Sequence, residues 1–193
     1  GPSKTGTSTL QQFLKSNRAG LAARGYRTPA LISARNHHAV ADMVLDPQAE
    51  ADARRPDRLR ATARLVAWQA QFQEEFRAEA ETSPRAENVV MSSEQMAKLT
   101  RPGEVARLHD LLAPLGHEIR VVAYLRPQDQ MFVSSYSERV KGGLRGPLVA
   151  GPGLAGPAYA NYQAVLAPWA AAFGKDALRL GIFERSQMRD NDL

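Results

Sequence analysis

The first eleven residues, GPSKTGTSTLQ, place a lysine and several small hydroxyl residues in a turn bounded by two glycines, directly before an amphipathic segment. The backbone N–H groups of such a turn and the positive end of the following helix favour an oxyanion, to which Lys4 adds a full charge. The order differs from the nucleotide triphosphatase pattern G-x-x-x-x-G-K-[ST], because Lys4 precedes the second glycine, Gly6. A serine- and threonine-rich helix cap would account for Thr7 or Ser8 but not for Lys4. The segment therefore predicts an oxyanion site.

A second pair of polar residues surrounds the end of the best predicted strand, residues 119–125. Arg126 follows that strand directly, and an arginine there points into the crevice where α/β sheets bind ligands. Its planar fork of N–H donors matches phosphate oxygens. Ser134, eight residues later, lies about two turns along the next predicted helix and supplies a neutral donor. Alone, either residue would be read as a solvated side chain, but together with the glycine-bounded turn they favour a binding role.

The glycine-bounded turn resembles the 5′-phosphosulfate loop of sulfotransferases that use 3′-phosphoadenosine 5′-phosphosulfate (PAPS), P-K-[TAS]-G-T-[TS]-x-L. Ser3 replaces the proline of that pattern, and the lysine, glycine, threonine, serine and leucine match. In the same family an arginine at a strand end and a serine eight residues later hold the 3′-phosphate, as Arg126 and Ser134 would here. The resemblance implies that the cofactor is bound by Ser3, Lys4, Thr5, Gly6, Thr7, Ser8, Arg126 and Ser134.

Less specific likenesses extend over nearly the whole chain. Residues 89–94, with their Ser-Ser-Glu turn, look like a strand and turn of bacterial sulfotransferases, and residues 159–185 look like their closing helix and strand. The resemblance implies one sulfotransferase domain over residues 1–193 with a P-loop nucleotide-binding-like fold. It also implies that the first strand and a C-terminal segment of that domain are not part of this sequence.

The activity that the resemblance implies is transfer of a sulfuryl group from PAPS to a hydroxyl or amine acceptor, leaving the nucleotide PAP. The acceptor would be a small molecule or a glycan, carbohydrate or lipid-linked, and no metal is expected. Lys4 would stabilise the charge that develops on the leaving phosphate. The base that takes the acceptor proton is Glu94, beyond a strand end, or His37 or His38, near the start of a helix, because relatives use either region. Glu94 could instead be a capping acid beside Ser93.

Two other functions fit parts of the pattern. A binding protein could keep the nucleotide crevice, with PAP as a regulator, and carry out no transfer. A P-loop kinase would need Mg²⁺ ligands, for which Thr5 could serve, but none of the three predicted strand ends presents an aspartate.

Composition limits the remaining classes. The net charge is +5, and the densest basic cluster, residues 54–64, contains no aromatic residue for base stacking, so nucleic acid is not an expected partner. The chain has no cysteine, and its four histidines form no H-E-x-x-H motif, which argues against a zinc site. Residues 146–174 are uncharged, but prolines and glycines break this stretch, so it is not expected to span a membrane. No signal peptide is visible, and a cytoplasmic location is expected.

The alternation of apolar periodicities predicts the elements that position these residues. Helices are expected over residues 7–24, 37–45, 58–81, 102–115, 127–142 and 159–173, and strands over 88–91, 119–125 and 178–183. Such alternation indicates a three-layer α/β domain with a central parallel sheet flanked by helices. The expected core faces are those of Leu10, Phe13, Leu14 and Leu21 on the first helix and Leu65, Trp68, Phe72 and Phe76 on the third.

Overall fold

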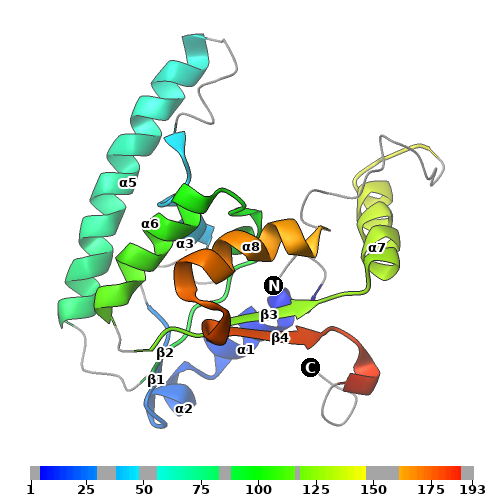
Figure 1. The fold of residues 1–193 in the computed structure, drawn as a ribbon, viewed down its shortest axis with the longest axis horizontal. Coiled ribbons are helices and arrows are strands. Elements are labelled where there is room, and N and C mark those ends of the chain that lie inside the picture. The colour runs from blue at the N-terminus through cyan, green and yellow to red at the C-terminus, as the bar shows by residue number, and fades with distance from the viewer. Residues whose placement is uncertain are drawn as a thin grey trace.

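The structure is a computed structural model that describes residues 5–29, 38–47, 56–82, 88–115, 118–146 and 161–187. These residues form a mixed α/β arrangement whose helices surround short parallel strands (Figure 1). In both whole-molecule views the pair β3 (Val121–Leu125) and β4 (Leu178–Ile182) lies between α1 (Thr7–Ser16) on one side and α8 (Tyr162–Phe173) on the other.

The strands pair in parallel, as the sequence predicts. β1 (Tyr26–Arg27) pairs with β2 (Asn88–Val89), and β3 pairs with β4 in a register that aligns Val121 with Leu178. Within the described residues these are two separate two-stranded ladders, whereas the sequence predicted one central sheet. A Cβ at Gly181 of β4 would lie 2.9 Å from the ring of Tyr124 on β3, so a larger residue there would displace that ring.

The first predicted helix is broken in two. α1 ends at Ser16, and α2 (Arg18–Ala22) begins after Asn17. The prediction of a single helix over 7–24 is therefore wrong. The side-chain amide of Asn17 donates to the carbonyl of Phe13 at 2.9 Å, so the side chain competes for a helical carbonyl. The expected apolar face is also only partly buried: Leu14 is buried, but Leu10 is 43% exposed and Phe13 52% exposed.

A hydrophobic core joins three helices of the first two-thirds of the chain. These are α3 (His38–Asp42), α5 (Pro56–Thr82) and α6 (Pro102–Leu112). Phe72 and Phe76 of α5 are buried in this core as predicted, whereas Trp68 is 36% exposed and stacks on Phe72 at the margin. The indole N–H of Trp169 from α8 donates to the carbonyl of Leu99 at 3.2 Å, which ties α8 to the same core.

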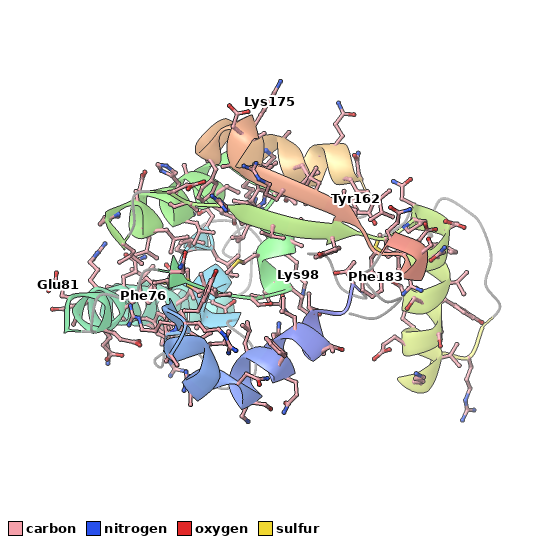
Figure 2. All side chains as sticks on the ribbon, turned by 90° about the horizontal axis from the view of Figure 1, so that it is seen from below. Phe76, Glu81, Lys98, Tyr162, Lys175 and Phe183 are labelled. Carbon is pink, nitrogen blue, oxygen red and sulfur yellow. The ribbon has the colours of Figure 1, made fainter. Side chains whose placement is uncertain are left out.

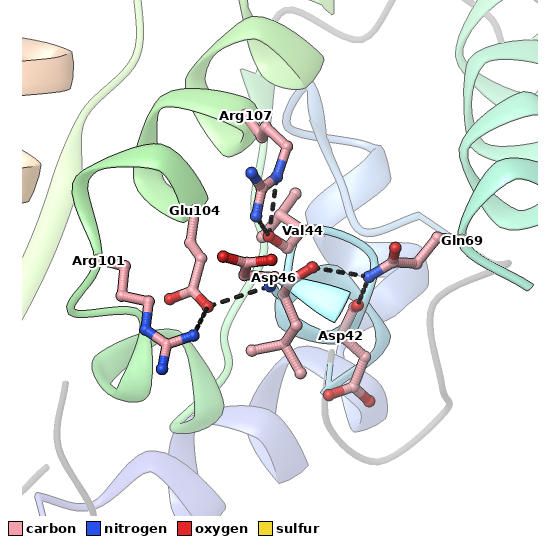
Figure 3. A network of polar contacts seen from close by, with 8 residues as sticks. Asp42, Val44, Asp46, Gln69, Arg101, Glu104 and Arg107 are labelled. Atoms are coloured by element: carbon pink, nitrogen blue, oxygen red, sulfur yellow. Dashed lines mark hydrogen bonds and ion pairs between the residues drawn. The ribbon is translucent and has the colours of Figure 1, made fainter. Parts of the chain in front are cut away.

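Polar side chains from α5 and α6 hold the turn that follows α3 (Figure 3). Gln69 of α5 donates to the carbonyls of Asp42 and Leu45 at 2.8 and 3.0 Å, and Arg107 of α6 donates twice to the carbonyl of Val44. The carboxylate of Glu104, almost fully buried, accepts the backbone N–H of Asp46 at 3.1 Å. The N–H groups of Met43 and Val44 bond to carbonyls of α3, and these side chains add partners for the carbonyls of the turn and for the Asp46 N–H.

The remaining elements complete the connections. A 3₁₀ helix, η1 (Gln95–Lys98), follows β2, and η2 (Ala113–Leu115) extends α6. α7 (Gln128–Lys141) follows β3, and η5 (Lys175–Ala177) and η6 (Arg185–Gln187) flank β4. No helix within the described ranges is both long enough and apolar enough to cross a bilayer.

The core predicts a clear contrast between two positions of α5. Phe76→Ala removes a side chain that is 2% exposed and should lower the free energy of unfolding by about 3–5 kcal/mol. Val66→Ala, at a position 48% exposed on the same helix, should change it by less than about 0.5 kcal/mol. Urea unfolding followed by circular dichroism measures both. Equal losses for the two variants would show that α5 does not pack as described.

Candidate functional site

The predicted oxyanion loop is described from Thr5 onward; Ser3 and Lys4 lie outside the described residues. Gly6 occupies the N-cap position of α1 with φ +72° and ψ 11°, a left-handed conformation that glycine adopts at little cost. Thr5 and Thr7 are buried on either side of it, and Ser8 is exposed. Gly6 provides no capping side chain, so the positive end of α1 is built of backbone N–H groups, which favour an anion.

A hydrogen bond connects α1 to the turn after β2. The side-chain amide of Gln11 donates to the carbonyl of Ser92 at 3.3 Å, and Ser92 and Ser93 are both buried. Glu94, one of the three candidate bases, follows them and is half-buried. The structure thus brings the helix of the oxyanion loop beside the Ser-Ser-Glu turn, although their residues are 81 positions apart in the sequence.

The same turn bears on the capping interpretation of Glu94. Ser93 Oγ accepts the backbone N–H of Gln95 at 3.2 Å. Glu94 stands at the N-cap of η1, but its carboxylate makes no capping hydrogen bond. Ser93, and not Glu94, therefore supplies the side-chain hydrogen bond at the start of η1. Of the other base candidates, His38 begins α3, and His37 lies outside the described residues.

Arg126 lies directly after β3, as predicted, and contacts from two distant elements hold it. The Tyr162 hydroxyl, at the start of α8, donates to the Arg126 carbonyl. The Arg126 guanidinium carbon lies 5.8 Å from the centre of the Phe183 ring, within cation–π range. Phe183 follows β4, and its backbone N–H donates to the Leu125 carbonyl at 2.8 Å, one hydrogen bond beyond the paired strands.

Ser134 is on α7, as predicted, and is half-buried. The helix begins immediately after Arg126: its N-cap is Pro127, whose carbonyl accepts the N–H of Met131 at 2.9 Å. Met131 is buried, and its sulfur lies 3.6 Å from the Tyr162 hydroxyl. Arg126 and Ser134 are therefore parts of one strand–helix unit that α8 anchors through Tyr162.

Sequence reasoning did not identify Tyr162, Phe183 or Gln11 as supporting residues. Tyr162 and Phe183 lie near the C-terminal end of β4, away from Lys175 near its start (Figure 2). Their partners are in other elements, so no local spacing in the sequence indicates these contacts. Parallel pairing explains why they meet, since the carboxyl ends of β3 and β4 share one edge.

Within the parts of the chain that the structure describes, no group of three or more histidines and carboxylates is placed to hold a metal ion. Comparison with protein-family models, with curated proteins and with solved structures finds no match to this chain.

The environment of Tyr162 predicts a change of stability at alkaline pH. Burial raises the pKa of the Tyr162 phenol above its ordinary value of 10.0, and the positive charge of Arg126 opposes this. A group whose pKa is raised by folding stabilises the fold fully below its unfolded pKa, and this contribution is lost as the pH rises through the folded pKa. The stability advantage of the native chain over Tyr162→Phe should therefore be constant from about pH 7 to 9 and shrink above about pH 10.

Urea unfolding of the two proteins across this range measures the difference. The other tyrosines ionise in both proteins, so their effect cancels. A difference that stays constant up to about pH 11 would contradict the half-buried position of Tyr162.

Proposed function

We propose that this chain is a sulfotransferase that transfers the sulfuryl group of PAPS to a hydroxyl or amine acceptor. The observation that carries the proposal is the placement of Arg126 at the carboxyl end of a parallel strand, held there by Tyr162 and Phe183, with Ser134 two turns along the following helix. An arginine fork and a hydroxyl on adjoining elements suit a phosphate group. This arrangement supports a binding site for the 3′-phosphate.

The other end of the cofactor would lie at the start of α1. The left-handed turn at Gly6 and the backbone N–H groups of the first helical turn support an oxyanion site there. Lys4, outside the described residues, would add the positive charge that the sequence places in this loop. The bond between Gln11 and Ser92 supports a place for Glu94 near the same helix.

The proposed fold is a P-loop nucleotide-binding-like sulfotransferase domain with three layers. The two parallel ladders and the helices on both sides of β3 and β4 support it.

In the proposed reaction the acceptor oxygen attacks sulfur in line with the bridging oxygen of the phosphosulfate. The new sulfur–oxygen bond forms as the bond from sulfur to the bridging oxygen breaks, and the electron pair stays on the 5′-phosphate of PAP. Lys4 and the N–H groups of the loop stabilise that charge, and Glu94, His37 or His38 takes the acceptor proton. Positioning and charge stabilisation supply the catalysis, as in phosphoryl transfer.

The proposed phosphate site predicts selective binding of PAP. Arg126→Ala should weaken PAP by about thirtyfold or more, because it removes a charge-assisted fork worth on the order of 2 kcal/mol, while AMP should lose much less. Arg120→Ala removes the same charge beside the opposite end of β3, where Arg120 is exposed and paired with Glu118, and should change neither affinity. Isothermal titration of the native chain and of both variants, with PAP and with AMP, measures the dissociation constants. Equal losses of PAP and AMP in Arg126→Ala would rule out the 3′-phosphate assignment.

The proposed role of Lys4 concerns the rate of transfer. Lys4→Ala should lower kcat by roughly a hundredfold or more, the scale seen when one preorganised oxyanion donor is lost, with a smaller loss of PAP affinity. Lys15→Ala, in the last turn of α1, is the matched control and should leave both unchanged.

Single-turnover transfer of labelled sulfate from PAPS, beside PAP titration of the same variants, separates rate from affinity. If Lys4→Ala binds the cofactor weakly but transfers sulfate at the native rate once it is saturated, Lys4 only anchors the cofactor. PAP binding with no transfer to any sugar or lipid acceptor would identify a binding protein, and transfer from ATP with Mg²⁺ would identify a kinase.

A further inference from the structure

The peptide group between Arg126 and Pro127 has only one hydrogen-bonding atom. Proline has no backbone N–H, so the carbonyl oxygen of Arg126 is the only hydrogen-bonding atom of this peptide group. That carbonyl accepts the hydroxyl of Tyr162. The peptide is also the joint between the end of β3 and the start of α7. The hydrogen bond from α8 therefore helps to hold the backbone from which the Arg126 side chain projects.

Tyr162 is itself well anchored. It is the first residue of α8, and the side chain of Asn161 caps that helix by accepting the N–H of Ala164 at 3.1 Å. The phenol oxygen also lies 3.6 Å from the buried sulfur of Met131, in the first turn of α7. These contacts restrict the position of the Tyr162 hydroxyl. Its hydrogen bond therefore links the carbonyl of Arg126 to both α7 and α8.

Phe183 acts on the other end of the same residue. Its ring centre lies 5.8 Å from the guanidinium carbon of Arg126, and its backbone is bonded to Leu125. The positive guanidinium lies over the Phe183 ring, an attractive contact that restricts the Arg126 side chain. A long side chain that is already held loses less freedom when it binds a phosphate.

We infer that Tyr162 and Phe183 are positioning residues that hold Arg126 in the orientation for a 3′-phosphate, and that they set the preference for nucleotides with a 3′-phosphate over those without one. The inference rests on the proposed function and concerns residues to which that proposal gives no role with the substrate. Neither side chain needs to contact the nucleotide. Their effect is carried by the carbonyl and the guanidinium of Arg126.

The test compares the affinities for PAP and AMP in variants that change one contact each. Tyr162→Phe keeps the ring and removes the hydroxyl, and it should weaken PAP about tenfold but AMP less than about twofold. Phe183→Leu keeps an apolar side chain and removes the aromatic face, and it should weaken PAP about threefold with the same selectivity. Tyr124→Phe removes a hydroxyl from β3 itself, at an exposed position two residues before Arg126, and should change neither affinity.

The outcomes separate this inference from the function on which it rests. Equal losses of PAP and AMP in Tyr162→Phe, or unchanged PAP binding in both Tyr162→Phe and Phe183→Leu, would overturn the positioning role even if Arg126→Ala discriminates between the nucleotides. If the native chain itself does not prefer PAP and Arg126→Ala has no selective effect, the proposed function fails instead. Urea unfolding of each variant shows whether it is folded under the conditions of the titration, as a positioning role requires.

Discussion

The parallel register of β3 against β4 determines the geometry around Arg126. It sets the ends of the two strands side by side, so the first residue after β3 meets the first residue after β4, and the backbone of Phe183 adds one more hydrogen bond to the ladder. α8 leads into β4 through η5, and its first residue reaches back to Arg126. A shift of register by one residue would turn the side chains to the opposite face of the sheet and separate these groups.

A second constraint holds the part of the molecule that supports this ladder. The core of α3, α5 and α6 is closed by polar side chains that bond the backbone of one turn, and Trp169 joins α8 to the core through the carbonyl of Leu99. Val121 and Leu178, which begin the two paired strands, pack against the same core. The ladder is therefore fixed at its beginning by packing, and the candidate site lies at its other end.

Periodicity predicted the elements where one pattern ran long enough to be distinctive: α5 covers the expected 58–81, and the parallel pairing of the two longer strands is confirmed. It failed at Asn17, where a side chain competes with the helix, and at Leu10 and Phe13, because an apolar face is buried only where another element covers it. The positions of Arg126 and Ser134 follow from local sequence. The contact of Tyr162 with Arg126 joins residues 36 positions apart and depends on how α8 returns to the sheet, which no local pattern contains.

The central claim is that one nucleotide spans the start of α1 and the end of β3. A crystal structure of the complex with PAP tests it most directly. The account predicts that oxygens of the 3′-phosphate lie within hydrogen-bonding distance of the Arg126 guanidinium and of Ser134 Oγ, while the 5′-phosphate lies at the N–H groups of the first turn of α1. A PAP molecule whose 3′-phosphate contacts neither Arg126 nor Ser134 would contradict it.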